Sequence, residues 1–453
     1  MLRSKLSLRN FSFVIFVLGI IYQLFHFSSP FIDEALYINA GKRIQNGMYL
    51  YDGYSSWFNG SPFIWPLLSS IIHEYFGLVG SRLFSSAFTF ITLIYFWKLT
   101  NKLFNKSIAD WSLLLLCSNF YVVSFAFIAV YDSMALCFFI MGFYYFQFET
   151  AKSKKLSAFL ISISIFVKYA FLGMIPILIM HTLVTKRYKH FWKTLLYIGW
   201  LTLPYFYFIR GGFLSSYGAA DWSPDRFAIL IMLANFLKDS LILCSFGLVL
   251  IFIKKENKRY GVFFILSLIM WPTFHILFQN NTSAHKHIVY GLFISFPLIG
   301  ILFDKLALKK KVLAFSLFVL TFLYQISLFK NSDYIWPNFN TGFEYLNENY
   351  QNGEVIFSTK PEHVQYHLKL YKHKSCDLIL NDWCIEQTQM KVCNTNWVVI
   401  NRYKWDKQQV LVDEIINCGF TLESKTSSKL KVVKDIFSFI EVNHQLEIYK
   451  KTK

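Results

Sequence analysis

The sequence predicts a polytopic membrane protein, mainly α-helical with about eleven transmembrane helices, followed by a small extracytoplasmic α/β domain. The 453 residues are 55% hydrophobic and 20% aromatic, and only 16% are charged. Soluble domains average about 45–50% apolar and about 25% charged residues. Apolar runs of nearly membrane-spanning length also recur along the first 328 residues and then stop. These observations exclude disorder, a collagen-like fibre and a small disulfide-stapled domain, and they argue against an ordinary soluble enzyme.

The expected spans alternate with short basic clusters. They lie at residues 11–27, 79–97, 111–129, 133–149, 156–168, 170–184, 194–209, 238–253, 260–278, 288–304 and 312–328. Because a crossing helix takes about 20 residues, the runs 156–168 and 170–184 also fit two halves of one bent hairpin. The first run follows Arg3, Lys5 and Arg9, but no small-residue cleavage site comes after it. We therefore interpret it as a span and not as a signal peptide.

Charge is distributed unevenly along the chain. Residues 331–453 hold 15 basic and 15 acidic residues, so residues 1–330 carry the whole formal charge of +18. Short basic clusters between apolar runs indicate membrane topology and not nucleic-acid binding. The alternate loops hold 21 Lys and Arg on one side and 6 on the other. This bias predicts a cytoplasmic N-terminus and, with an odd number of spans, an extracytoplasmic C-terminus, which we expect at a bacterial inner (plasma) membrane.

The last part of the chain, residues 329–453, has the pattern of a soluble α/β domain, and residues 1–328 form the transmembrane body. Strand-like runs and helical patterns are mixed in it. The strand-like runs begin at Glu354, Trp397 and Leu430, and the helical patterns cover residues 363–371 and 405–417.

Four cysteines lie in this C-terminal region, at Cys376, Cys384, Cys393 and Cys418. On an extracytoplasmic face an even number permits two disulfides, in any of three connectivities. Their spacing does not match a zinc site, although a metal site stays an alternative.

Acidic residues are scarce in the body, so their positions are informative. Asp33 and Glu34 are adjacent in the long loop 28–78, close to the end of the first span. Asp132, in AVYDSMALCFF, lies in the turn between the third and fourth spans, on the same side. Carboxylates next to apolar spans are costly and often mark functional sites. The alternative for Asp33 is a structural N-cap of a helix over residues 34–44.

The stretch DEALYINAGKRIQNGMYLYDG, which starts at Asp33, resembles the first extracytoplasmic loop of the GT-C superfamily of membrane glycosyltransferases. It is most similar to the branch of the bacterial aminoarabinose transferases and the dolichyl-phosphate-mannose protein mannosyltransferases. The similarity continues through SPFIWPLLSSIIHEYFGLVGSRLFSS. Asp132 fits the second-loop acid of the family, and IFVKYAFLGMIP, with Lys168, resembles its Leu-x-Lys-Gly segment. Motifs support the resemblance over residues 25–180, and topology alone supports it elsewhere.

The sequence departs from the family pattern at two places. Tyr169 replaces the usual glycine after Lys168, and Gly60 and Ser61 precede Pro62 where some members have Glu-Lys-Pro. A lysine for the donor phosphate therefore cannot come from the position before Pro62, which weakens an assignment to the aminoarabinose branch.

The resemblance implies transfer of a sugar from a polyprenyl-phosphate donor to an extracytoplasmic acceptor, which is a protein, a lipid or an envelope glycan. Inversion at the anomeric carbon is expected. The reaction needs a carboxylate base and positive charge on the departing phosphate. Asp33 is the expected base, and Glu34 or Asp132 is expected to orient the acceptor or to position Asp33.

The donor phosphate needs cationic side chains, and five candidates follow. Lys168 could instead extend from a short span to the membrane surface, and the segment SAHKHIVY could be an interfacial anchor. The candidates are Lys168, Lys286, His285, His287 and Arg82.

Aromatic residues of the first loop are candidates for binding the sugar, in particular Tyr37, Tyr54 and Trp57. They also fit an interfacial belt. No metal ion or other cofactor is expected. His285 and His287 point about 200° apart on a helix, which is poor geometry for binding one metal ion. A divalent cation held by acidic residues stays an alternative.

Two other functions are compatible with such a chain. A transporter or flippase of lipid-linked saccharides would have ionisable residues in mid-span and paired broken segments in two halves. A non-catalytic scaffold would tolerate the loss of Asp33 and Asp132. The acids lie at the ends of the spans, and no internal repeat is evident, so a glycosyltransferase is the favoured interpretation.

Overall fold

The computed structural model contains two compact units. The described residues are 7–47, 63–218, 226, 230, 233, 243–251, 258–277, 284–332, 339–359, 361–370, 378–380, 391–402, 407–427, 431–434, 439–442 and 445–452. Unit 1 comprises Met1–Gln23, Ser56–Ile64 and Arg82–Leu328. Unit 2 comprises Leu24–Ser55, Trp65–Ser81 and Phe329–Lys453.

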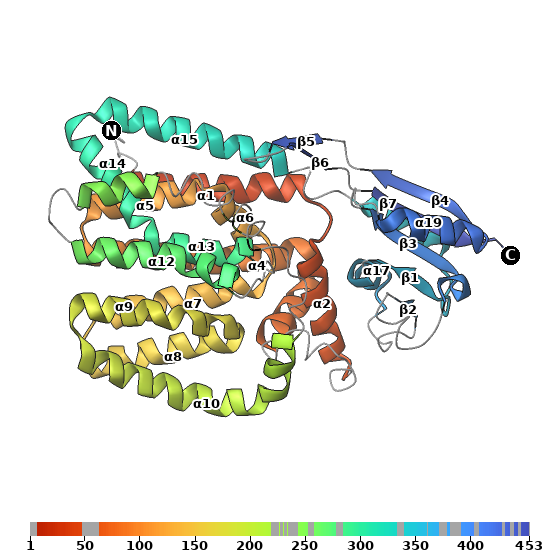
Figure 1. Cartoon of the computed structure of the whole chain (residues 1–453), viewed down its shortest axis with the longest axis horizontal. Helices are drawn as coiled ribbons and strands as arrows, with labels where there is room; N and C mark the ends of the chain where they lie inside the picture. The colour runs from red at the N-terminus through yellow and green to blue at the C-terminus, as the bar shows by residue number, and fades with distance from the viewer. Residues whose placement is uncertain are drawn as a thin grey trace. The chain divides into compact units, whose positions relative to one another are not determined.

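Unit 1 is built of helices, several of them long (Figure 1). They are α1 (Leu8–His26), the second part of α4 (Ile64–Leu103), α5 (Lys106–Cys117), α6 (Phe120–Phe127), α7 (Tyr131–Phe146), α8 (Ala151–Val167), η2 (Tyr169–Met174), α9 (Ile175–Thr185), α10 (Tyr188–Gly218), residues 243–251, α12 (Lys258–Leu277), α13 (Ala284–Ser295), α14 (Pro297–Lys309) and α15 (Lys311–Ser332).

Apolar composition and length identify the helices that can cross a membrane. Within the described residues four helices pass this test, and up to six do if each of two bent pairs is one span. The bent pairs are α5 with α6, at 66°, and Lys286–Ser295 with Pro297–Lys309, at 44°. Large apolar side chains point outward on α10 and α15, including Trp200, Val312 and Leu320. Such exposed apolar faces fit lipid and not water.

Polar side chains mark where several of these helices begin. Asn105, Asn119 and Thr150 each accept a hydrogen bond from the backbone N–H three residues later. Each bond satisfies one of the N–H groups that the first turn of a helix leaves without an intrahelical partner. The cap at Asn119 starts α6 directly after α5 ends, and it thereby produces the bend between them.

Unit 2 combines segments from both ends of the chain. It contains α2 (Ile32–Gln45), the first part of α4, α16 (Asn340–Asn349), α17 (Pro361–Leu368), η3 (Val392–Asn394), α19 (Lys407–Asn417), β1 (Ile356–Ser358), β2 (Ile379–Leu380), β3 (Trp397–Arg402), β4 (Phe420–Ser427), β5 (Lys431–Lys434), β6 (Phe439–Val442) and β7 (Gln445–Lys451). The expected strands at Glu354, Trp397 and Leu430 overlap β1, β3 and β5. The expected helical patterns overlap α17 and α19.

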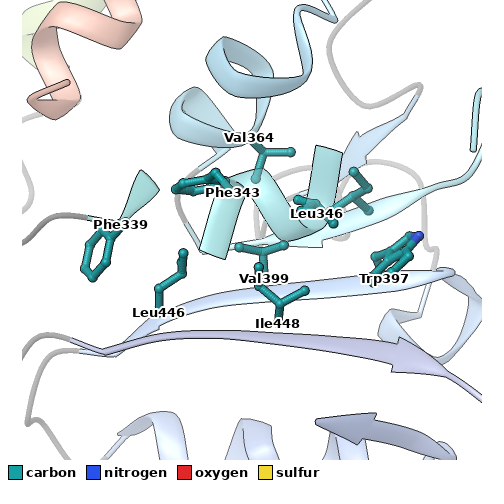
Figure 2. Packing of buried hydrophobic residues seen from close by; sticks show 9 residues of the cluster. Phe339, Phe343, Leu346, Val364, Trp397, Val399, Leu446 and Ile448 are labelled. Atoms are coloured by element: carbon teal, nitrogen blue, oxygen red, sulfur yellow. The ribbon is translucent and has the colours of Figure 1, made fainter. Parts of the chain in front are cut away.

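The main sheet has the strand order β2-β1-β3-β7-β4, and β5 pairs only with β6. Strand β1 runs parallel to β2 and β3, whereas β7 is antiparallel to β3 and β4. Alternate residues of a strand point to opposite faces, so each face has its own apolar core. One core packs against α16 and α17, as Figure 2 shows for Phe343, Leu346 and Val364. The other packs against α19 through Val412 and Ile415.

A disulfide joins Cys393 of η3 to Cys418, which follows α19, with a Cα–Cα separation of 5.2 Å. That separation is typical of disulfides. The two remaining cysteines of this region, Cys376 and Cys384, lie outside the described residues.

Helix α2 lies in close contact with the other elements of unit 2. A Cβ at Gly41 would overlap the carbonyl oxygen of Pro66, so only glycine permits this approach of α2 to α4. The amide of Asn39 donates to the carbonyl of Glu362 in α17 at 2.8 Å. Gly77 has φ of 64° and interrupts α4. A residue with a side chain would be strained at Gly77, which explains the position of the kink.

Candidate functional site

A buried carboxylate lies at the centre of the candidate site in unit 1. Asp132 is in the first turn of α7, and its side chain is fully buried. The turn before it is held by Ser85, whose hydroxyl lies 2.7 Å from the carbonyl oxygen of Ile128 and 2.7 Å from the hydroxyl of Ser133. These contacts fix the backbone that carries Asp132.

The partner of this carboxylate is Lys168. Helix α8 ends at Val167, and Lys168 itself is extended, with φ of −148°. This break directs its side chain to Asp132, and the ammonium nitrogen lies 2.5 Å from Oδ1. Only 4% of the Lys168 side chain is exposed. The alternative in which Lys168 extends to the membrane surface is therefore wrong.

Lys168 makes further contacts with helix α13. Its ammonium group is 3.2 Å from Nε2 of His287 and 3.2 Å from the hydroxyl of Tyr290. Tyr290 in turn contacts Oδ1 of Asp132. The ring of Tyr131 lies 4.8 Å from the ammonium nitrogen, a favourable cation–π distance.

The protonation pattern follows from the chemistry of lysine, because an ammonium group only donates hydrogen bonds. Nε2 of His287 must therefore accept, which places the proton of neutral His287 on Nδ1. Nδ1 lies 3.0 Å from Nε2 of His275 in α12, so His275 accepts there. A continuous chain of hydrogen bonds thus runs from Asp132 through Lys168 and His287 to His275.

A second buried cation acts on Asp132. Lys286 is buried and interacts electrostatically with the same carboxylate. In the described part of unit 1 the other carboxylates bond elsewhere: Asp110 to Trp97, Glu149 to Arg187 and Asp304 to Ser107. Two buried ammonium groups therefore interact with the carboxylate of Asp132. Cationic side chains in such an environment can stabilise an anionic ligand.

Arg82 is buried in the part of α4 that belongs to unit 1, and its guanidinium carbon lies 4.5 Å above the ring of Phe127. It adds another cation to this unit. His285 lies in α13, but its side chain is outside the described residues.

The expected base is found in unit 2. Asp33 is half-buried in the first turn of α2. The helix begins at Ile32, so Asp33 is not its N-cap, and the structural alternative for Asp33 is wrong. Glu34 has the capping role instead: its carboxylate accepts from the backbone N–H of Phe31 at 2.8 Å, and its side chain is fully buried.

Of the three aromatic candidates, the structure describes only Tyr37. Tyr37 of α2 is buried, with only 3% of it exposed. Tyr54 and Trp57 lie outside the described residues. Among the described residues no group of three or more His, Cys, Asp or Glu side chains could hold a metal ion.

Two members of the hydrogen-bonded chain, Tyr290 and His275, were missed by sequence reasoning. Tyr290 follows Lys286 by one helical turn, a spacing that places both on the same face of α13. His275 is a single polar residue within an apolar helix, which is more often a satisfied core histidine. Only the hydrogen bond between His287 and His275 shows that His275 belongs to the site and is not an ordinary core histidine.

Comparisons with known proteins show what the chain is similar to. Residues 8–213 match the model of the Alg9-like mannosyltransferase family. The crystal structure of ArnT from Cupriavidus metallidurans in the apo state superimposes with a TM-score of 0.60, at 10% identity, over 97% of both chains. The match over residues 8–213 and the shared fold support a glycosyltransferase with the GT-C fold, similar to ArnT. The resemblance seen in the sequence is confirmed.

Further solved structures share the fold of this chain. ArnT from the same organism bound to undecaprenyl phosphate has a TM-score of 0.59 at 11% identity, again over 97% of both chains. AglB from Archaeoglobus fulgidus, in complex with an inhibitory peptide and a dolichol-phosphate, has a TM-score of 0.55 at 10% identity. That match covers 86% of this chain and 69% of the AglB chain. No curated protein sequence matches it.

Proposed function

We propose that the protein transfers a sugar from a polyprenyl-phosphate donor to an extracytoplasmic acceptor, with inversion at the anomeric carbon. The observation that carries this proposal is the pair of buried ammonium groups, Lys168 and Lys286, which both interact with the carboxylate of Asp132. Pre-organised cationic side chains of this kind stabilise an anionic leaving group such as a lipid phosphate. The undecaprenyl phosphate and dolichol-phosphate of the ArnT and AglB complexes support this choice of donor.

Lys168 and Lys286 have complementary tasks in the proposal. Lys168 already donates to Asp132, Tyr290 and His287, so its position is fixed and its charge is what acts on the phosphate. Lys286 lies on the same helix as His287 and supplies the second charge. His285, His287 and Arg82 remain secondary candidates for contacts with the phosphate.

Asp33 is the proposed base. It would take the proton of the acceptor hydroxyl or amine as that group attacks the anomeric carbon, while the bond to the phosphate oxygen breaks. Glu34 positions α2, and thereby Asp33, through its bond to Phe31. Oδ2 of Asp132 has no hydrogen-bond partner among the described residues, so it is available to orient a substrate hydroxyl.

We also propose eleven crossings, a cytoplasmic N-terminus and an extracytoplasmic C-terminal domain in a bacterial inner membrane. The helical state of the apolar runs and the bias of basic residues between the two sets of loops support this topology.

Donor cleavage in liposomes tests the proposal. Purified protein would be incubated with labelled polyprenyl-phosphate sugars, and release of polyprenyl phosphate would be measured. We expect Asp33→Asn to slow release by about 10²- to 10⁴-fold, as loss of a general base does. Lys168→Met should lower it strongly, while Lys155→Met, at an exposed lysine of α8, should leave it unchanged. Full activity of both Asp33→Asn and Lys168→Met in folded protein would contradict the proposed site.

A further inference from the structure

A polar pocket of about 290 Å³ lies within unit 2. It is formed by the segment before α2, the turn after the kink of α4, and the helices α16 and α17. Its volume is close to the lower end for small-ligand pockets, about 300 Å³. The lining residues are Ser28, Pro30, Leu78, Asn340, Glu344, Tyr366 and His367.

The polar side chains of this pocket are held in place by their surroundings. The amide oxygen of Asn340 accepts from the hydroxyl of Ser29 at 3.0 Å, and the hydroxyl of Tyr366 lies 2.8 Å from Nε2 of His73. The His367 ring stacks on Phe343, with the ring centroids 4.3 Å apart and the planes 6° apart. Pre-organised groups of this kind bind a ligand at a low entropic cost.

His367 is the lining residue whose hydrogen bonding is incomplete among the described residues. Its Nε2 atom is buried, and among the described residues it has no hydrogen-bond partner. Burial lowers the pKa of His367 to about 4, so the ring is neutral at physiological pH. A neutral imidazole offers one donor and one acceptor. A buried polar atom without a partner is costly unless a ligand or water satisfies it.

The chemistry of the lining selects the class of ligand. The lining residues include one carboxylate, Glu344, and no lysine or arginine, so the pocket does not favour a phosphate. The hydroxyl, amide, carboxylate and imidazole groups can both donate and accept hydrogen bonds, as a ring of sugar hydroxyls requires. Pro30 and Leu78 provide an apolar patch for the C–H face of such a ring.

We infer that this pocket binds a hydroxyl-rich saccharide unit of the acceptor. This inference rests on the proposed function, because only a transfer reaction has an acceptor. Pro30 precedes Asp33, the proposed base, by three residues. Three residues span at most about 11 Å, so the pocket adjoins the segment that carries the base. The donor phosphate, in contrast, is assigned to the cationic residues of unit 1.

Binding of simple glycosides tests this assignment. The full-length protein in lipid nanodiscs would be examined by saturation-transfer-difference NMR with the methyl glycosides of mannose, glucose, galactose and N-acetylglucosamine. Mannose 6-phosphate serves as the anionic probe and glycerol as a non-cyclic polyol. We expect at least one glycoside to bind more tightly than mannose 6-phosphate and glycerol.

Glu344→Gln should weaken this binding about ten-fold or more, because a hydrogen bond to a charged group is lost. His367→Phe, which preserves the stacking on Phe343, should weaken it too. Glu348→Gln, one turn further along α16 and exposed, is the matched control and should bind like the wild type. Absence of glycoside binding to the wild type, or unchanged binding to Glu344→Gln and His367→Phe, would overturn the assignment.

Donor cleavage, measured in parallel, separates this inference from the proposed function. Cleavage that depends on Lys168, without any glycoside binding, would remove the pocket from the acceptor site and leave the transferase proposal intact. Glycoside binding that depends on Glu344, without cleavage of any donor, would support the saccharide pocket and contradict the proposed reaction.

Discussion

The ammonium group of Lys168 lies 2.5 Å from a carboxylate oxygen of Asp132, and the two side chains are 4% and 0% exposed. They are 36 residues apart in the sequence, so tertiary packing alone brings them together. A buried ion pair of this kind contributes little net stability, whereas one member left without the other is strongly destabilising. Loss of either charge should therefore destabilise the helices that hold Asp132 and Lys168.

The first prediction concerns this pair. Lys168→Met and Asp132→Asn should each lower the free energy of unfolding by about 3–5 kcal/mol, because each leaves an uncompensated buried charge. The double variant should be more stable than either single variant. Thermal unfolding of the four proteins in detergent gives the coupling energy. Additive effects of the two substitutions would show that the two groups do not interact.

The second prediction assigns His275 as a positioning residue. Its Nε2 accepts from His287, which keeps the ring of His287 oriented toward Lys168. His275→Leu should lower kcat/KM for donor cleavage about five- to ten-fold, the loss of one buried hydrogen bond. His275→Gln supplies another acceptor and should recover most of the rate. Equal losses in both variants would indicate a packing role only.

The third prediction tests the close approach of α2 to α4. Gly41→Val places side-chain atoms against the backbone of Pro66 and the hydroxyl of Ser70, so the helices must move apart. We expect a loss of about 1–3 kcal/mol in the free energy of unfolding. Gly199→Ala in α10 is the control, because a Cβ there meets no atom within 4 Å. The control should be neutral or slightly stabilising, and a neutral Gly41→Val would contradict the proposed contact.

The fourth prediction is a pH dependence of unit 2. Burial lowers the pKa of His367 from about 6.5 in the unfolded chain to about 4 in the folded one. Between pH 6.5 and 4 the ring of His367 is protonated in the unfolded chain but still neutral in the folded one. The free energy of unfolding therefore has its full value above pH 6.5 and falls as the pH drops toward 4. The total loss is about 3 kcal/mol.

Chemical unfolding of wild type and His367→Phe across this range measures the effect. The wild type should lose stability more steeply than the variant between pH 6.5 and 4, and the two should run parallel above pH 7. Parallel curves over the whole range would mean that His367 has the same pKa in the folded and unfolded chains.

Composition and charge pattern predicted a helical membrane protein, because apolar length and basic loops are properties of single segments. Asp132 and Lys168 were recognised individually, since each is an ionisable residue within an apolar sequence. Their pairing was not predicted, because neither the break after α8 nor the register of α7 against α8 is encoded in a short motif.

The start of α2 shows how a small error in a helix boundary changes the role of a residue. The sequence suggested Asp33 as the N-cap of a helix that starts at residue 34. The helix begins at Ile32, which places Asp33 inside the first turn and Glu34 at the position that reaches back to Phe31. Backbone geometry, not residue type, makes that difference.

Unit 2 is assembled from three stretches of chain, two of which are synthesised hundreds of residues before the third. The amide of Asn39 can meet its partner, the carbonyl of Glu362, only after residue 362 has been translated. Helix α4, which packs against Gly41, is translated much earlier. During synthesis α2 can therefore pack against α4 long before α17 exists, and a chain that ends near residue 328 would lack the contact between α2 and α17.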